Sequence, residues 1–139
     1  MPTPTTTLLD TNTLIDVQSR SSPRFVQSLQ AVFDASVIGI IAINPIVLGE
    51  FAEGFDDRAE LEQALPPVVI QLPLPARAGW LAGQALRQYR ARGGSRTSPV
   101  ADFYIGGHAQ ADGLRLLTRD VARFSTYFPD VELVVPDDR

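Results

Sequence analysis

Cysteine and lysine are both absent from this 139-residue chain. Without cysteine there is no disulfide, no thiolate nucleophile and no cysteine-ligated zinc. Long apolar runs are also missing, because no stretch approaches the roughly 20 residues that a membrane-spanning helix needs. No basic residue precedes the short apolar stretch near the N-terminus, so we expect no signal peptide. Together these absences indicate a cytoplasmic protein without a membrane partner.

The basic residues that are present are unevenly distributed. All 12 are arginines, and the net charge of the chain is −4. Residues 64–101 hold five arginines and no Asp or Glu, so this stretch carries +5 and leaves −9 for the rest. A net acidic chain is not typical of proteins that coat nucleic acid. The arginine-rich stretch is therefore either a local phosphate-binding surface or a solvated helix face.

Strand-like and helix-like patterns alternate along the chain. Strands are expected at residues 5–9, 37–43, 68–72, 114–118 and 131–135. Helices are expected from residue 11, at 23–33, from 45 past 50, at 57–65, 75–92 and 99–113, and between the last two strands. Three of them open on a cap residue followed by proline, at positions 22–23, 44–45 and 98–99. The alternation predicts one domain, residues 1–139, with a three-layer α/β/α fold and a five-stranded, mainly parallel sheet.

Four acidic residues fall where this fold brings chain segments together. Asp10 directly follows the first expected strand, and Asp120 lies two residues beyond the fourth. Asp102 lies in the first turn of a helix, and Glu50 shares the inward face of another helix. Strand C-termini and helix N-termini lie at the same edge of a parallel sheet, where ligands bind. We therefore expect these four carboxylates to be neighbours.

Neighbouring carboxylates repel one another and raise one another's pKa values, and a divalent cation removes that conflict. Oxygen ligands favour Mg²⁺ or Mn²⁺ over zinc. Each carboxylate also has a simpler interpretation, as a turn former, a surface residue or a complement to the helix dipole. The other acidic residues are expected to be solvated, with Glu53 the strongest exception: Asp16, Glu53, Asp56, Asp57, Asp112, Asp137 and Asp138.

Four segments together resemble the PIN-domain nucleases, and the closing residues 127–134 are similar to the VapC-like toxin branch. The segments are residues 8–15 (LLDTNTLI), 44–50 (NPIVLGE), 102–109 (DFYIGGHA) and 117–124 (LTRDVARF). The resemblance covers essentially the whole chain. It departs at Gly49, where a slightly larger residue is common, and in the Arg- and Gly-rich loop at 92–98.

The resemblance implies that Asp10, Glu50, Asp102 and Asp120 bind Mg²⁺ or Mn²⁺ and carry out catalysis. It implies that Asn12 and Thr118 orient water, substrate or the carboxylates. The implied activity is endoribonuclease cleavage that leaves a 3′-hydroxyl and a 5′-phosphate, in a toxin that is held inactive by an antitoxin and is commonly dimeric. From the charge pattern we expect the RNA-binding residues to be Arg87, Arg90, Arg92 and Arg96.

Other functions fit the sequence less well. Receiver domains and haloacid-dehalogenase-like phosphatases also place an Asp after the first strand, but both families depend on a lysine that this chain lacks. A PIN-like module that binds RNA or protein without cutting is the stronger alternative, although such a module has little need of four clustered carboxylates. His108, the single histidine, is expected to be structural, and Trp80 and Tyr89 are expected in the core or at a dimer interface.

Overall fold

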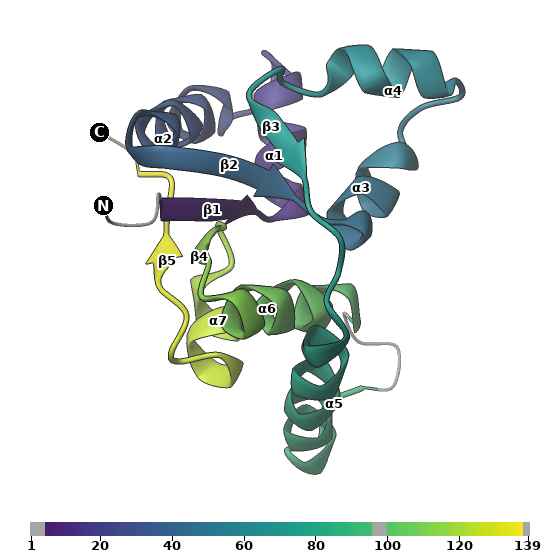
Figure 1. The fold of residues 1–139 in the computed structure, drawn as a ribbon, viewed down its shortest axis with the longest axis vertical. Helices are drawn as coiled ribbons and strands as arrows, with labels where there is room; N and C mark the ends of the chain where they lie inside the picture. The colour runs from purple at the N-terminus through teal and green to yellow at the C-terminus, as the bar shows by residue number, and fades with distance from the viewer. Residues whose placement is uncertain (1–4, 96–99, 138–139) are drawn as a thin grey trace.

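The computed structural model describes residues 5–95 and 100–137, which form five strands and seven helices (Figure 1). The strands are β1 (Thr5–Leu9), β2 (Gly39–Ile43), β3 (Val69–Gln71), β4 (Arg115–Leu117) and β5 (Leu133–Val134). The helices are α1 (Thr11–Gln18), α2 (Phe25–Ile38), α3 (Pro45–Ala52), α4 (Arg58–Ala64), α5 (Ala76–Ala91), α6 (Val100–Asp112) and α7 (Val121–Tyr127).

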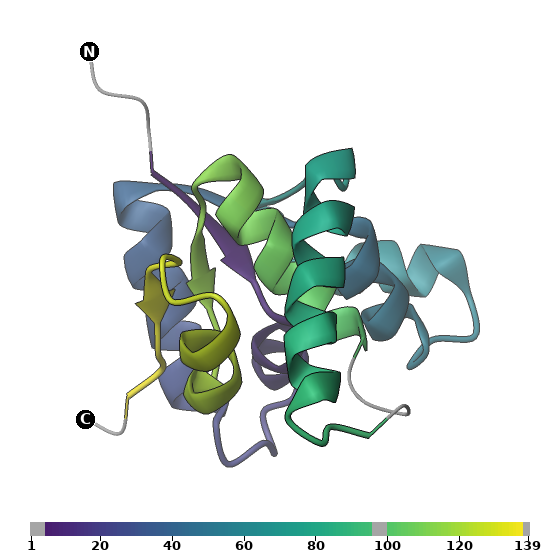
Figure 2. The same cartoon turned by 90° about the horizontal axis from the view of Figure 1, so that it is seen from below.

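All five strands form one parallel sheet in the order β3-β2-β1-β4-β5, which confirms the predicted fold class. Right-handed crossovers place the helices on both faces of such a sheet. Helices α1 and α2 pack together on one face, and α5, α6 and α7 pack together on the other (Figures 1 and 2). The strand order reverses at β1, so the C-terminal ends of β1, β2 and β4 lie next to one another.

The C-terminal ends of the central strands are apolar on both faces because helices cover both faces. Leu8 and Leu9 of β1 and Leu116 and Leu117 of β4 are completely buried. In β2, Ile43 is equally inaccessible to solvent. These side chains form the centre of the core and fix the strand ends from which the polar loops leave.

The boundary between α2 and β2 differs from the prediction. Residues 37 and 38 were expected in the strand, but the helix continues through Ile38, and Val37 is exposed on its surface. The strand begins at Gly39, where a Cβ atom would lie only 1.8 Å from the backbone oxygen of Thr5. A glycine is needed at this close approach to β1, and an apolar run alone does not locate it.

The start of α2 was also predicted too early. Ser22 and Pro23 form a turn before the helix, in which Ser22 Oγ accepts a hydrogen bond from the backbone N–H of Arg24. The predicted cap at Asn44 is confirmed, since its side chain accepts a hydrogen bond from the backbone N–H of Val47. The predicted cap at 98–99 lies outside the described residues. No helix in the described part of the chain is long and apolar enough to cross a membrane.

Candidate active site

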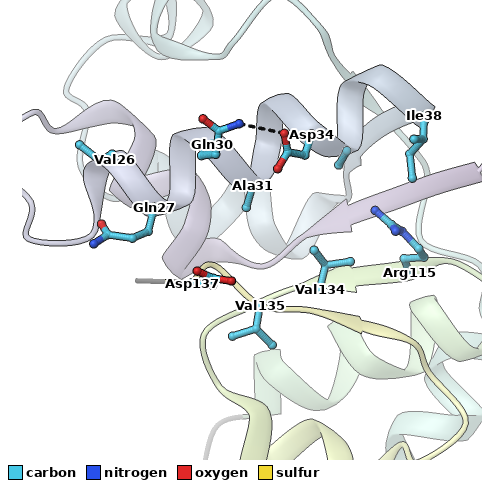
Figure 3. Close-up of a pocket in the computed structure, with 11 residues that line it drawn as sticks. Val26, Gln27, Gln30, Ala31, Asp34, Ile38, Arg115, Val134, Val135 and Asp137 are labelled. Carbon is cyan, nitrogen blue, oxygen red and sulfur yellow. Dashed lines mark hydrogen bonds between the residues drawn. The ribbon is translucent and has the colours of Figure 1, made fainter. Parts of the chain in front are cut away.

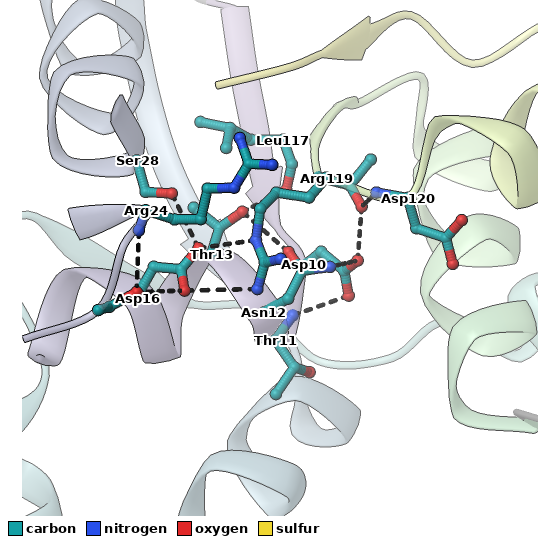
Figure 4. Close-up of polar contacts among 12 residues, drawn as sticks. Asp10, Thr11, Asn12, Thr13, Asp16, Arg24, Ser28, Leu117, Arg119 and Asp120 are labelled. Carbon is teal, nitrogen blue, oxygen red and sulfur yellow. Dashed lines mark hydrogen bonds and ion pairs between the residues drawn. The ribbon is translucent and has the colours of Figure 1, made fainter. Parts of the chain in front are cut away.

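Asp10 lies between β1 and α1 and links both to β4. Its backbone N–H donates to the carbonyl of Leu117 over 2.9 Å, which continues the sheet by one residue. Its carboxylate caps α1 by accepting a hydrogen bond from the Thr11 N–H over 2.8 Å. The second oxygen accepts from the Thr118 hydroxyl over 2.6 Å. It also accepts from the Asn12 amide over 3.1 Å (Figure 4). Asp10 is only 3% exposed.

This environment favours the neutral form of Asp10. Burial is the main cause that raises its pKa from 3.8 to about 6, and the charges of Asp102 and Glu50 add to the rise. Hydrogen bonds from Thr118 and Thr11 act in the opposite direction. The three groups that donate to the carboxylate, the Thr11 N–H, the Asn12 amide and the Thr118 hydroxyl, are all neutral, so none of them compensates its negative charge. A deprotonated Asp10 at neutral pH would gain strongly from a nearby cation.

Glu50 reaches the same region from α3. The half-buried Glu50 carboxylate accepts a hydrogen bond from the Thr11 hydroxyl, 39 residues earlier in the chain. Asn44 at the start of α3 also contacts His108 of α6, with Asn44 Nδ2 and His108 Nδ1 3.1 Å apart. This buried contact joins the helix of Glu50 to the helix of Asp102. It agrees with the expected structural role of the histidine.

Asp102 and Asp120 approach each other through Arg123, a residue the sequence reasoning did not select. Arg123 Nη1 donates to Asp102 Oδ2 over 2.7 Å and lies 3.6 Å from Asp120 Oδ2. Burial raises the pKa of Asp102, and the charge of Asp120 adds to this rise, whereas Arg123 lowers it. Asp120 caps α7 and Arg123 lies three residues later in its first turn, and this spacing was the sequence signal for their contact.

Thr118 connects these two halves of the site. Its hydroxyl donates to Asp10 and accepts a hydrogen bond from the Asp120 backbone N–H over 3.0 Å. Asp120 in turn caps α7, because its side chain accepts a hydrogen bond from the Arg123 N–H. Hydrogen bonds and ion pairs thus run from Glu50 through Thr11, Asp10 and Thr118 to Asp120, Arg123 and Asp102. The structure brings the four carboxylates to one edge of the sheet.

The carboxylates at this edge do not form a ready-made cage for an ion. Within residues 5–95 and 100–137, no three Asp, Glu, His or Cys side chains are arranged so that they could hold one metal ion. The chemistry of the donors nevertheless suits Mg²⁺ or Mn²⁺, because they are carboxylate and hydroxyl oxygens. The raised pKa of the buried Asp10 points the same way, since its negative charge is poorly compensated.

The expectation that Asp16 is solvated was wrong. Asp16 is buried and pairs with Arg119, whose Nε lies 2.8 Å from Asp16 Oδ2 (Figure 4). The hydroxyls of Ser22 and Ser28 also donate to its carboxylate, over 3.2 and 3.0 Å. Arg119 lies between Thr118 and Asp120, so this pair ties α1 to the turn that carries two site residues. The pair depends on a contact across 103 residues, which sequence spacing does not reveal.

The predicted RNA-binding arginines lie on or near α5. Arg87 and Arg90 are exposed on that helix, and Arg96 lies outside the described residues. The Arg92 guanidinium lies over the ring of Tyr127 in α7, 5.3 Å from its centre. Helix α7 also carries Arg123, and α5 packs closely against α6, which carries Asp102. Arg87, Arg90 and Arg92 therefore belong to a segment that packs against α6 and α7, the helices that carry Asp102 and Arg123.

A cavity of about 580 Å³ lies elsewhere, between α2 and the C-terminal segment around Val134 (Figure 3). Its lining includes Gln27, Gln30 and Arg115 but none of the four carboxylates. The candidate site is therefore identified by its four carboxylates and not by the volume of a cavity.

Several solved structures that share this fold come from toxin–antitoxin systems. VapBC2 from Rickettsia felis, bound to a DNA fragment from its promoter, matches with a TM-score of 0.72 and 19% identity over 95% of this chain and 99% of that chain. DNA-bound VapBC from Salmonella typhimurium matches with a TM-score of 0.72 and 21% identity over 96% and 99%. The sarcin-ricin loop cleaving toxin VapC20 from Mycobacterium tuberculosis has a TM-score of 0.60 and 18% identity over 86% and 93%.

At these identities the structural matches show the fold. No curated protein matches the sequence. The family model of the PIN domain, however, matches residues 7–127, a range that includes Asp10, Glu50, Asp102 and Asp120. Since that range is most of the 139 residues, this chain belongs to the PIN-domain family.

Proposed function

We propose that this protein is a Mg²⁺- or Mn²⁺-dependent endoribonuclease and the toxin of a toxin–antitoxin pair. The observation that carries the proposal is the hydrogen-bonded chain of four carboxylates at one sheet edge, within the PIN-domain match. One structural neighbour is itself described as a toxin that cleaves the sarcin-ricin loop. The substrate class proposed here is RNA in the cytoplasm, cut at a phosphodiester bond.

Different residues would have different roles in this reaction. When bound, a divalent ion would lower the pKa of its water ligand and neutralise charge on the scissile phosphate. Asp10, Glu50, Asp102 and Asp120 would hold the ion, and Asp102 or Asp120 would accept the proton of the attacking water. Thr118 and Asn12 fix the direction of the Asp10 carboxylate, and Thr11 fixes that of Glu50. Arg87, Arg90 and Arg92, with Arg96, would contact phosphates of the RNA.

Cleavage of purified total RNA, with Mg²⁺, Mn²⁺ or EDTA, tests the proposal. We expect cleavage only with metal, and a loss of at least about a hundredfold in Asp10→Asn and Asp102→Asn, because each removes a charged ligand. Asp34→Asn is the matched control, since Asp34 is an exposed α2 residue that contacts Gln30. End-labelled oligoribonucleotides should show a 3′-hydroxyl and a 5′-phosphate.

Two outcomes would contradict this function. Cleavage that survives both substitutions would come from a contaminant or from a different site. Binding of RNA without metal-dependent cleavage by the wild-type protein would favour the alternative, a PIN-like module that only binds.

An antitoxin partner is part of the proposal. The outer face of α2 carries an apolar stripe in which Val26 is 69%, Phe33 62% and Val37 70% exposed. Exposed apolar surface of this kind marks protein contacts, and several structural neighbours are toxin–antitoxin complexes. Trp80 on α5, predicted in the core or at a dimer interface, is 67% exposed and therefore not in the core. We propose that it lies at the interface of a homodimer. An antitoxin reading frame next to this gene would support the pairing.

A further inference from the structure

Arg123 stands between two of the carboxylates that the proposed reaction needs. Its Nη1 atom lies 2.7 Å from Asp102 Oδ2 and 3.6 Å from Asp120 Oδ2. The three side chains are 27%, 22% and 39% exposed, respectively. The guanidinium is therefore at the mouth of the site, where it can exchange its carboxylate contacts for water without crossing the core.

A divalent ion and this guanidinium need the same oxygen atoms. Magnesium binds carboxylate oxygens at about 2.0–2.1 Å in a nearly octahedral shell. In the present arrangement Asp102 Oδ2 already accepts the short hydrogen bond from Arg123, and a second cation at that oxygen would repel the guanidinium. Arginine cannot relieve this repulsion by losing its proton, because it stays charged at every physiological pH.

The neighbouring Arg119 is held differently. Its guanidinium is engaged by the buried Asp16 on the other side of the turn, 2.8 Å from the carboxylate. Arg119 therefore leaves Asp120 available, although it is adjacent in sequence. Arg119 thus stabilises the turn, whereas Arg123 binds the carboxylates of Asp102 and Asp120.

We infer that Arg123 is the internal counter-cation of the site and that it competes with the divalent ion for Asp102 and Asp120. This inference rests on the proposed function. Arg123 neutralises the two carboxylates, and binding of the ion releases the guanidinium from them.

Titration with Mn²⁺ tests the competition, with free Mn²⁺ followed by electron paramagnetic resonance at fixed pH and ionic strength. Arg123→Gln should bind Mn²⁺ about tenfold more tightly than the wild type, since the competing charge is gone. Arg58→Gln is the matched control, because it removes the same charge from an exposed α4 residue that pairs with Glu62. Its affinity should stay within about twofold of the wild type.

A second variant separates charge from shape. Arg123→Lys keeps the positive charge, so its Mn²⁺ affinity should remain closer to that of the wild type than to that of Arg123→Gln. Without metal, Arg123→Gln should unfold at a lower urea concentration than the wild type, and saturating Mn²⁺ should reduce this difference. Circular dichroism establishes that both variants are folded before the titrations are compared.

The outcomes separate this inference from the proposed function. Equal or weaker Mn²⁺ binding by Arg123→Gln, with wild-type binding that Asp102→Asn abolishes, overturns the competition and leaves the nuclease site standing. An Arg123→Lys variant that binds as tightly as Arg123→Gln also overturns it, because charge would then not be the cause. Absence of Mn²⁺ binding in every form overturns both proposals.

Discussion

Replacing Asp10 by Asn should stabilise the fold at neutral pH while abolishing activity. Burial and the neighbouring carboxylates raise the pKa of Asp10 from 3.8 to about 6. Since one pKa unit corresponds to about 1.4 kcal/mol, the ionised side chain destabilises the folded state by about 3 kcal/mol above pH 6. An amide has the same shape and carries no charge, so this destabilisation disappears in the variant.

The hydrogen bonds of the site reduce the expected gain. The Thr11 N–H can still donate to the amide oxygen of an asparagine at position 10. The other oxygen of Asp10, which accepts from Thr118 and Asn12, would become an NH₂ group and face two present donors. Rearranging these contacts costs about 1 kcal/mol. The net stabilisation at pH 7.5 should therefore be about 1–2 kcal/mol.

The stabilisation by Asp10→Asn should depend on pH. The folded-state pKa is raised, so the folded protein holds the Asp10 proton more tightly than the unfolded chain does. The destabilisation by this group is therefore small near pH 4, where the folded state is protonated and the unfolded chain is only partly ionised, and it grows as the pH rises to about 6. The advantage of Asp10→Asn should be present at pH 7.5 and should vanish or reverse at pH 4.

Urea unfolding in EDTA at pH 7.5 and pH 4 measures this difference. Asp34→Asn provides the control for loss of one exposed carboxylate. If the free-energy difference between wild type and Asp10→Asn were the same at both pH values, the carboxylate would not carry the electrostatic strain that its burial predicts. The reasoning about the site would then fail at its most buried residue.

Two further substitutions test the arginines. Replacing both Arg87 and Arg90 by Gln should weaken the binding of a labelled oligoribonucleotide, measured by fluorescence anisotropy. The slope of log K against log salt concentration should fall in magnitude by about 1.4, because each phosphate contact contributes roughly 0.7. An unchanged slope, which is the result expected for the control Arg58→Gln, would exclude these contacts. In urea titrations at neutral pH, Arg119→Met should lower the free energy of unfolding by more than Asp16→Asn does. Arg119→Met leaves the buried Asp16 carboxylate without its counter-charge, whereas Asp16→Asn leaves an arginine that reaches solvent. The reverse order would contradict the ion pair's role.

The fold followed from local signals wherever those signals were strong. The strand at 5–9 and the helix opened by Asn44 are placed as expected, because each has a polar residue with a definite structural role at its boundary. The boundary at Gly39 could not be placed, because it depends on contact with Thr5, a residue 34 positions away. Apolar composition alone does not distinguish the last turn of a helix from the first residues of a buried strand.

The candidate site was predictable at the level of topology and not at the level of contacts. Strand ends and helix starts determine that Asp10, Glu50, Asp102 and Asp120 approach the same sheet edge. The partners of these carboxylates depend on side-chain directions in elements far apart in the chain. Arg123 and the hydroxyl of Thr11 were therefore not selected, and Asp16 was wrongly expected in solvent.

The two buried aspartates of the α1 region show how compensation separates a structural acid from a reactive one. Asp16 has a guanidinium and two hydroxyls around it, so its charge is matched within the fold. Asp10 is contacted by hydroxyl, amide and backbone N–H groups, which direct the carboxylate but leave its charge unmatched, and its pKa rises accordingly. Neutral donors have the further advantage that they do not repel an incoming cation. A buried carboxylate that is well oriented but poorly neutralised is the arrangement expected where a protein reserves a place for an ion.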